Sequence, residues 1–543
     1  MNSPSVTAGS APLITALRSP ACYAHPAGHI ELLETHISWV ILTGQYAYKI
    51  KKPVNLGFLD FSTLEARRRC CEEELRLNRR LAPSLYDAVV KITGSPDAPH
   101  VSGEGAAIEY AVRMREFPQS ALASRLLTEG AITSKHIDAL AARIAGFHAN
   151  TGVAARGSPY GAPETVIASA RENFSALDQL LTDGTAKAPI AELRAWTEHE
   201  YHARWTLFVA RQTDGYVRDG HGDLHLGNIL MLDGQLTPFD CIEFNPALRW
   251  IDVMSEIAFL IMDLMDRGHT NFATRFLNAY LESADDYEGL KVLRFYLVYR
   301  AMVRAKVHGL RAAQSDISST ERARLLEACR GYIALAQRCA NSACPAIILM
   351  HGMSGSGKSV VAQALAETFG AIRLRSDIER KRLSGLDPLA RSGSKLASGI
   401  YTGELTLDTY NRLLDIARRA TNAGYATVVD ATFLKRWQRD LFRIEARMRG
   451  IPFAIVDVTA PEAALLARIA NRAAAGSDAS EADQAVLTYQ LAQRDALTNE
   501  ELPQVLHIDT SRANATVTLR EACETLPVLL AASTSQAVRP HTL

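Results

Sequence analysis

The chain has 543 residues, 48% of them hydrophobic and 22% charged, which is ordinary for a globular protein of about two to four domains. Basic and acidic residues total 59 each, so no net charge draws the protein to nucleic acid or to an anionic membrane. No secretory signal, membrane-spanning run or C-x-x-C pair occurs, which argues against export, a membrane anchor and a zinc site. We expect a cytoplasmic protein without nucleic-acid or membrane partners, and its oligomeric state stays open.

The first half begins with a strand-rich segment. Residues 38–42 and 45–51 are apolar and β-branched on either side of a glycine-containing turn, which predicts a β-hairpin. A stretch rich in Glu and Arg over 63–81 predicts a helix, and the stretches 89–92 and 107–114 predict further strands. The chain then becomes mainly helical. This order predicts a strand-rich lobe followed by a helical lobe.

One polar segment interrupts these helices. Asp223 precedes Asn228 by five residues in the run that begins at His221, and a strand ending at Asp240 follows. The segment resembles the catalytic loop of protein kinases, in the variant carried by the aminoglycoside phosphotransferase family. The resemblance implies that Asp223 takes a proton from the attacking hydroxyl, and that Asn228 and Asp240 bind magnesium. His221 is expected to anchor the loop backbone, and His225 receives no role.

The same resemblance assigns residues upstream and downstream of this loop. Lys49, on the second hairpin strand, matches the lysine that pairs with phosphates, and Glu74 is its expected helix partner. Lys51, two residues along, shares a strand face with Lys49. Lys51 and Glu73 stay open as alternatives, because charge-rich strands and helices are usually solvated faces. The segment 249–256 lies where relatives brace the catalytic loop. No glycine-rich loop precedes the first hairpin strand, which departs from the protein-kinase pattern.

The firmest motif lies in the second half. An apolar run over 346–350 leads into a Gly-x-x-x-x-Gly-Lys-Ser sequence, and a helical stretch follows. This order is that of a phosphate-binding P-loop, whose backbone N–H groups and helix N-terminus attract an anion. Lys358 is expected to reach the terminal phosphates, and the Ser359 hydroxyl is expected to bind magnesium. The residues expected to bind the nucleotide are Gly352, Ser354, Gly355, Ser356, Gly357, Lys358 and Ser359.

Beyond the P-loop, predicted strands alternate with helices. Further strands are expected at 371–375, 425–429, 453–458 and 504–509. Two of the intervening helices are expected to close on Gly424 and Gly450. Alternation of this kind predicts a parallel sheet with helices on both faces.

This half is similar to the small P-loop kinases that include gluconate kinase, shikimate kinase and zeta-toxin-like proteins. The resemblance implies that Asp377 contacts or deprotonates the acceptor hydroxyl, and that Asp430 is a magnesium-linked carboxylate. Both follow predicted strands, where such sheets bind ligands. Arg468 and Arg472 lie four apart on a helix, and the resemblance places them in a lid over the transferring phosphoryl group. A plain exposed helix face is the alternative. The Asn-Lys-x-Asp motif that recognises guanine does not occur in the sequence, so we expect ATP and not GTP.

The sequence therefore predicts two domains of mixed α/β and α+β class. The first is a two-lobed, protein-kinase-like fold, and the second is a P-loop fold with a doubly wound parallel sheet. The expected segments are a flexible N-terminus over 1–20, a kinase-like domain over 21–338, a linker over 339–345, a P-loop kinase domain over 346–532 and a flexible tail over 533–543.

We interpret the chain as a phosphotransferase that uses ATP and Mg²⁺. Each half is expected to transfer the γ-phosphoryl group of ATP to a hydroxyl group of a small molecule. In the alternative interpretation only the P-loop half is catalytic, and the N-terminal half is a nucleotide- or ligand-binding regulatory module. A toxin-like or nucleic-acid kinase is a weaker alternative, which the neutral charge disfavours. The acceptors stay open, because a fold does not determine a substrate.

Overall fold

The computed structural model describes residues 10–55, 57, 59–181, 186–315, 317–387, 390, 402–475, 483–511 and 515–537. The chain divides into two compact units. The first unit consists of the residues up to Ser175 together with Tyr201–Asp263. The second unit consists of Ala176–Glu200 together with the residues from Leu264 onward. The helices expected at the end of the kinase-like domain therefore fall in the same compact unit as the P-loop region.

The elements up to Asp266 are mainly strands at first and helices later. In chain order they are α1 Ser10–Ala16, β1 Glu31–Glu34, β2 Ser38–Leu42, β3 Tyr46–Lys51, α2 Leu64–Asn78, β4 Tyr86–Ser95, β5 Ala98–Val101, β6 Glu109–Arg115, α3 Ala123–Thr128, α4 Ser134–Asn150, α5 Pro163–Leu180, α6 Lys187–Ala203, α7 Trp205–Thr213, β7 Val217–Asp219, β8 Ile229–Leu232, β9 Gln235–Pro238, β10 Trp250–Asp252 and α8 Val253–Asp266. The predicted hairpin, the following helix and both later strands are confirmed.

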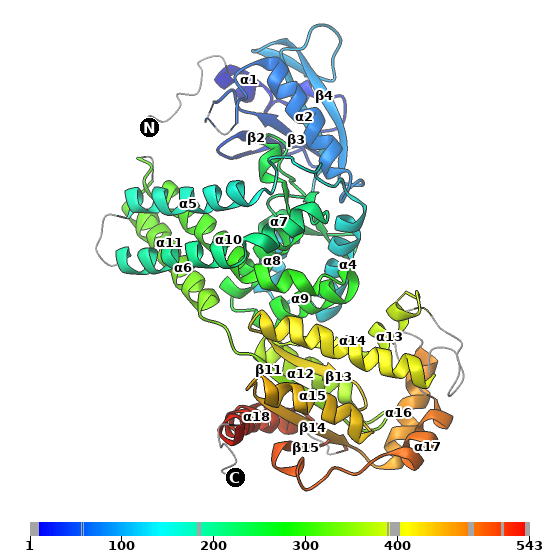
Figure 1. Ribbon diagram of the computed structural model, residues 1–543. Coiled ribbons are helices and arrows are strands. Elements are labelled where there is room, and N and C mark those ends of the chain that lie inside the picture. Colours follow the sequence, from blue (N-terminus) through cyan, green and yellow to red (C-terminus); the bar gives the residue numbers. More distant parts are fainter. Residues whose placement is uncertain are drawn as a thin grey trace. The chain divides into compact units, whose positions relative to one another are not determined.

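The first unit contains a six-stranded sheet in the order β1-β2-β3-β6-β4-β5, with all neighbours antiparallel. Helix α2 packs against β4 and β6 (Figure 1). It begins at a Thr63 cap, whose hydroxyl accepts a hydrogen bond from the Ala66 amide at 3.1 Å. In the sequence, the polar segment that begins at His221 lies between strand β7, which pairs with β10, and the short β8–β9 hairpin.

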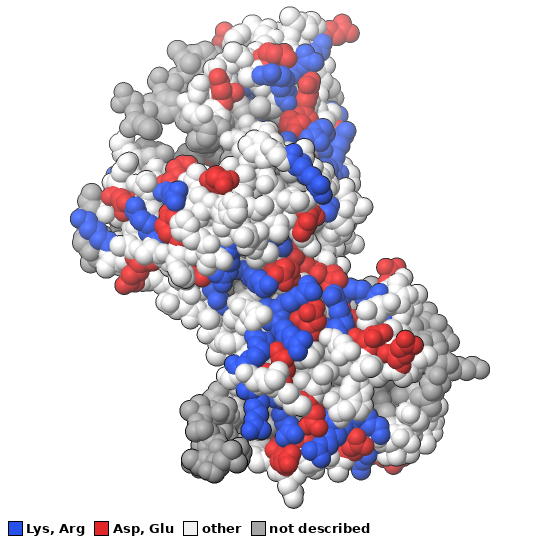
Figure 2. All heavy atoms as spheres, in the orientation of Figure 1, with Lys and Arg blue, Asp and Glu red and all other residues white. Residues whose placement is uncertain are grey.

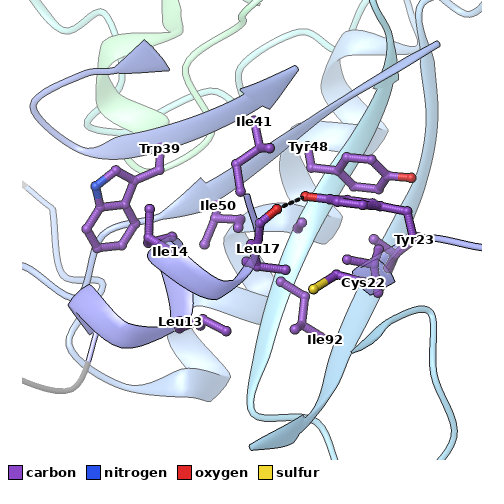
Figure 3. Packing of buried hydrophobic residues seen from close by; sticks show 13 residues of the cluster. Leu13, Ile14, Leu17, Cys22, Tyr23, Trp39, Ile41, Tyr48, Ile50 and Ile92 are labelled. Carbon is purple, nitrogen blue, oxygen red and sulfur yellow. Dashed lines mark hydrogen bonds between the residues drawn. The ribbon is translucent and has the colours of Figure 1, made fainter. Parts of the chain in front are cut away.

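The N-terminal segment is not flexible throughout, which corrects the expectation for residues 1–20. Helix α1 begins at Ser10, and Leu13, Ile14 and Leu17 are buried in a core with the sheet residues Trp39 and Ile41. The Tyr23 hydroxyl donates a 2.6 Å hydrogen bond to the Leu17 carbonyl at the edge of this core (Figure 3). The three apolar side chains recur with helical spacing, and burying them stabilises the helix by roughly 1.5–3 kcal/mol each.

The second half has the predicted alternation of strands and helices. The elements after α8 are α9 Thr270–Ala284, α10 Leu290–Ala312, α11 Ser319–Ala340, β11 Ala346–His351, α12 Lys358–Phe369, β12 Ile372–Arg375, α13 Ser376–Leu383, α14 Gly403–Asn422, β13 Ala426–Asp430, α15 Arg436–Met448, β14 Phe453–Thr459, α16 Glu462–Ala475, α17 Gln484–Gln493, β15 Val505–Asp509 and α18 Ala515–Ala537. Helix α18 extends past the expected start of the tail at residue 533. The Ser533 hydroxyl accepts a hydrogen bond from the Phe453 amide at 3.1 Å, so this part of the tail is packed.

The five strands of the second half form one parallel sheet in the order β12-β13-β11-β14-β15. Apolar side chains of α12 and α18 pack on one face of this sheet. Helices α14 and α15 pack against strands β11 to β14 (Figure 1). Gly424 and Gly450 follow the ends of α14 and α15 with positive φ values of 84° and 62°, as predicted. The predicted parallel sheet is confirmed.

The outer edge of strand β12 is covered by a side chain from α9. The Arg373 amide donates to Asn278 Oδ1 at 2.7 Å, and Asn278 Nδ2 donates to the Ala371 carbonyl at 3.0 Å. The amide of Asn278 thus takes the hydrogen bonds that a further strand would otherwise make. An ion pair of 2.9 Å between Glu282 and Arg373 lies beside it.

Acidic side chains are set among basic ones over much of the face seen in Figure 2.

Candidate active sites

The first candidate site is built around a buried group of charges at the end of β3. Lys49 Nζ lies 2.9 Å from Glu74 Oε1 and also contacts the Asp240 carboxylate. Lys51 contacts the other oxygen of Glu74 as well as Glu243. The two lysines share a strand face, as predicted, and one carboxylate of α2 binds both.

The carboxylate on α2 that pairs with these lysines is Glu74, and not Glu73. Glu73 is half-buried and pairs with Arg76 at 2.7 Å and with Arg249 at 2.9 Å. Glu74 is fully buried. Burial alone would raise the pKa of Glu74, but the ammonium groups of Lys49 and Lys51 outweigh it and hold that pKa at about 2. Glu74 is therefore ionised at neutral pH.

The pKa of Lys49 is also shifted by this group of charges. Burial would lower the pKa, but Asp240 and Glu74 raise it well above its ordinary value. Asp240 has a φ of 65°, a strained conformation for a residue other than glycine, and its amide donates to the Tyr86 hydroxyl at 3.1 Å. The cation expected to pair with phosphates and a carboxylate expected to bind magnesium thus lie together.

The polar loop brings the two other predicted residues together. Asn228 Nδ2 donates to Asp223 Oδ2 at 2.9 Å and to the Asp223 carbonyl at 3.0 Å. The side chain of Asp223 is 38% exposed, so a substrate hydroxyl can reach it. His225, which received no role from the sequence, has its Nε2 3.4 Å from Asp223 Oδ2 and accepts from the Gly227 amide through Nδ1.

Glu256 holds the start of this loop. Its Oε1 accepts from the amides of His221 at 2.6 Å and Gly222 at 2.7 Å, and its Oε2 lies 2.7 Å from His148 Nε2. A Cβ at Gly220 would lie 2.3 Å from this carboxylate, so the position requires glycine. Burial alone would raise the pKa of Glu256, but His148 and the other partners lower it to about 2.

The predicted anchoring role of His221 agrees with its contacts. Its ring is fully buried, and Nε2 lies 2.8 Å from the Phe239 carbonyl. This contact ties the loop to the end of strand β9. The bracing expected of segment 249–256 is present too, since Arg249 Nε donates to Asp219 Oδ1 at 2.7 Å and Arg211 pairs with Asp252 at 2.6 Å.

The second candidate site is the turn between β11 and α12. Gly352 and Gly355 have φ values of 140° and 82°, and a Cβ there would lie 2.3 Å from the Val458 carbonyl and 2.7 Å from the Leu465 carbonyl. Both positions therefore require glycine. The buried Ser356 Oγ has no hydrogen-bond partner among the described residues. A hydroxyl in this position is suited to an anionic ligand, so the loop fits the nucleotide phosphates predicted for it.

Lys358 and Ser359 lie at the start of α12, where the predictions place them. Lys358 Nζ donates to the Met353 carbonyl at 2.7 Å, which folds its side chain back over the loop. The Ser359 hydroxyl donates to Asp430 Oδ1 at 3.3 Å. Asp430 ends strand β13, so the parallel sheet brings a hydroxyl and a carboxylate together. Oxygen ligands of this kind suit Mg²⁺.

Arg468 contacts the P-loop itself. Its NH1 donates to the Gly355 carbonyl at 3.2 Å and to Thr510 Oγ1 at 2.9 Å, and its NH2 donates to the Thr510 carbonyl at 2.9 Å. Gln490 of α17 exchanges two hydrogen bonds with Ser354. Thr510 and Gln490 were not among the residues predicted from the sequence. The position of Thr510 directly after a predicted strand was the available signal.

The remaining predicted residues are less completely described. Asp377 lies in the first turn of α13, directly after β12, at the carboxyl edge of the sheet. Arg472 lies in α16, but its side chain falls outside the described residues, as does most of the expected lid loop. The roles of Asp377, Arg468 and Arg472 therefore stay predictions.

A family profile matches part of the chain, and relatives match most of it. A family profile described as "AAA domain" matches residues 347–497. An uncharacterized protein of Mycobacterium tuberculosis is 30% identical over 486 residues, which cover 87% of this chain and 93% of that protein. The chain belongs to the family of this mycobacterial protein. An uncharacterized protein of Mycobacterium bovis matches with the same identity and coverage, and so belongs to the family too.

Solved structures resemble each half of this family member. A gluconokinase from Sinorhizobium meliloti is 25% identical with a TM-score of 0.27, over 35% of this chain and 97% of that one. A choline/ethanolamine kinase family protein from Mesorhizobium loti is 10% identical with a TM-score of 0.36, over 58% of this chain and 94% of that one. The matched profile and the five-stranded parallel sheet give the C-terminal part a P-loop fold.

Within the described part of the chain, none of the helices combines the length and apolar character that a membrane span needs. All eight cysteines are free.

Proposed function

We propose that the protein is an ATP- and Mg²⁺-dependent phosphotransferase with two active sites, each acting on a hydroxyl group of a small molecule. The observation that supports this proposal is the presence of two separate sets of phosphate- and metal-binding groups. One set joins Lys49, Glu74 and Asp240 with the Asp223–Asn228 pair. The other set is the P-loop with Ser359 and Asp430.

In the first site Asp223 acts as the base for the acceptor hydroxyl. Its carboxylate is held by Asn228 and remains exposed, so it can take the proton as the oxygen attacks. Asp240 and Asn228 would hold the metal, which would supply charge neutralisation at the phosphates. Lys49, fixed by Glu74, pairs with the phosphates. The loop enters the reaction already ordered, because Glu256 fixes two of its amides.

In the second site the P-loop backbone and Lys358 would bind the phosphates of ATP, while Ser359 and Asp430 would hold the metal. Asp377 receives the acceptor hydroxyl at the carboxyl edge of the sheet. Arg468 supports the P-loop from the side through the Gly355 carbonyl. The positive end of α12 stabilises the charge on the phosphates.

A second candidate function has one observation in its favour. The connection from β1 to β2 consists of Thr35, His36 and Ile37, so this turn has no glycine with which to cover phosphates. In this alternative the N-terminal half binds a nucleotide or another ligand and regulates the P-loop half.

One experiment separates the two proposals. The parent, Asp223→Asn and Lys358→Met proteins are incubated with MgATP and a library of small hydroxyl compounds, and products are detected by the mass of an added phosphoryl group. Two active sites predict that each variant loses a different set of products. Loss of every product in Lys358→Met, with no loss in Asp223→Asn, would refute the two-site proposal and favour the regulatory module.

A further inference from the structure

A cavity of about 670 Å³ lies in the first unit, where three elements meet. Its walls are the segment 80–84 that follows α2, the C-terminal half of α4 and the β8–β9 hairpin. Its described lining residues include none of the candidate catalytic groups. Sites for small molecules commonly have volumes of roughly 300–1,000 Å³. We propose that this cavity is a separate binding site for a small organic anion that carries an apolar body.

The lining is apolar on one side and polar on the other. Leu81, Pro83, Phe147 and Leu232 supply apolar surface. The polar lining residues are Arg80, Ser84, Arg143, Asn150, Thr151, Asp233, Gln235 and Thr237. This mixture is typical of ligand sites, in which apolar contact supplies affinity and a few polar groups fix the orientation.

Arg143 is the residue that selects an anion. Its NH1 donates to Thr237 Oγ1 at 3.1 Å and to the Leu81 carbonyl at 3.5 Å, and its NH2 contacts Gln235 Oε1. All three acceptors are neutral, and no carboxylate of the described residues forms an ion pair with Arg143. A guanidinium has five N–H donors and a permanent charge, so it favours a carboxylate or a phosphate here.

The other charged groups of the wall limit what the ligand can be. Arg80 is already engaged, because it pairs with Asp219 at 3.2 Å and donates to the carbonyls of Asp219 and Gly220. Asp233 is the one carboxylate among the described lining residues, and it is 65% exposed and lies 3.4 Å from Arg115. Its charge disfavours a second anionic group at the rim. The cavity therefore suits a ligand with one anionic end near Arg143 and an apolar remainder.

The site is connected to the candidate catalytic loop in two ways. Arg80 joins the wall to Asp219 and Gly220, which directly precede His221. The β8–β9 hairpin lines the cavity, and the catalytic loop and Asp240 flank its two ends. An occupant is therefore expected to tighten the loop. Any effect on turnover rests on the proposed function, whereas binding and loop protection do not.

Calorimetric titration of the full chain tests the binding. The probes are phenyl phosphate, benzoate and neutral benzyl alcohol, and every protein carries Lys358→Met so that the P-loop takes up less phosphate. We expect the anions to bind to the Lys358→Met parent. Arg143→Gln should weaken that binding by at least about tenfold, because a charge-assisted hydrogen bond is lost. Arg125→Gln, at an exposed arginine of α3, should leave it unchanged.

The outcomes show whether the ligand is a phosphate or a carboxylate, and whether binding needs the charge of Arg143. Tighter binding of phenyl phosphate than of benzoate assigns a phosphate ligand, and the reverse assigns a carboxylate. Arg143→Lys keeps the charge but not the planar fork of donors, so it should bind the anions more tightly than Arg143→Gln does, which guards against a folding defect of the glutamine variant. Equal binding by Arg143→Gln and the parent, or no saturable binding of either anion, would overturn the proposal.

Hydrogen exchange tests the connection to the loop. Binding of the tighter anionic probe should slow exchange at the amides of His221 and Gly222 in the parent but not in Arg143→Gln. If the anion binds but amide exchange at His221 and Gly222 is unchanged, the proposed connection to the loop is wrong, while the binding site itself still stands. Binding by a protein that shows no Asp223-dependent turnover would contradict the proposed function alone, so the two failures can be told apart.

Discussion

Replacing Glu74 by glutamine perturbs the buried charges of the first unit with little change in shape. The carboxylate of Glu74 is fully buried between two lysines, and Lys49 Nζ lies 2.9 Å from it. Glutamine removes the charge and leaves Asp240 and Glu243 to balance both ammonium groups. Removing one partner of a buried ion pair costs about 3–5 kcal/mol, because a buried charge is left uncompensated.

The pKa of Glu74 provides a second measure of the same energy. Its folded-state value of about 2 lies below the ordinary value of 4.5. A lowered folded-state pKa means that the ionised group contributes stability above about pH 4.5, which is lost as the pH falls toward about 2. The difference between the two values is worth about 3 kcal/mol, in line with the cost of breaking the pair.

The assay is urea unfolding of the first unit, followed by pulse proteolysis and identification of its peptides. We expect Glu74→Gln to lower the free energy of unfolding by about 3 kcal/mol at pH 7 and by about half as much at pH 3. Glu72→Gln is the matched control on the same helix, since its ion pair with Arg68 is half-exposed and contributes little to stability. Equal effects of Glu74→Gln and Glu72→Gln would refute the reasoning.

Two further predictions concern the second unit. Asn278→Ala removes the partner of the Arg373 amide in β12 and of the carbonyl of Ala371, which directly precedes β12. We therefore expect the free energy of unfolding to fall by about 1–3 kcal/mol and amide exchange in β12 to rise. The exposed Asn271 of the same helix is the control, and an equal effect of Asn271→Ala would contradict the edge-capping role. Gly355→Ala places a Cβ 2.7 Å from a backbone carbonyl, so calorimetry should show MgATP binding weakened by more than about tenfold. Gly370→Ala, at a positive φ in open space, should cost only about 1 kcal/mol of stability and leave MgATP binding intact; weakened binding there would contradict the steric argument.

Most strands and helices were predictable because each depends on a local pattern. The five strands of the parallel sheet are apolar runs bounded by turns, and each was placed within one or two residues. Strand β1 was missed, since its four residues have no period long enough to recognise. Helix α1 was missed because its small and polar neighbours hide three apolar residues that only the folded sheet buries.

The candidate site residues also divide into those that a local sequence pattern predicts and those that it does not. The P-loop is contiguous, so its residues and their chemistry could be read from the order of strand, glycines and helix. Ser354 bonds to Gln490, which is more than a hundred residues away in the chain, and Arg468 bonds to Thr510, which is about forty residues away. A local sequence pattern cannot predict contacts over such separations. The bracing of Arg468 against the P-loop backbone was therefore not predictable.

By itself, the sequence predicted the P-loop, the loop from His221 to Asn228 that resembles a catalytic loop, and the order of strands and helices that places Lys49, Asp223 and Lys358. Tertiary structure alone decided that Glu74 and not Glu73 pairs with the lysines, because the rotation of α2 against the sheet turns one of two adjacent carboxylates inward. It also decided that α9 caps the edge of β12, through a contact 95 residues apart in the chain. Burial and long-range hydrogen bonds act between segments that a local pattern cannot connect.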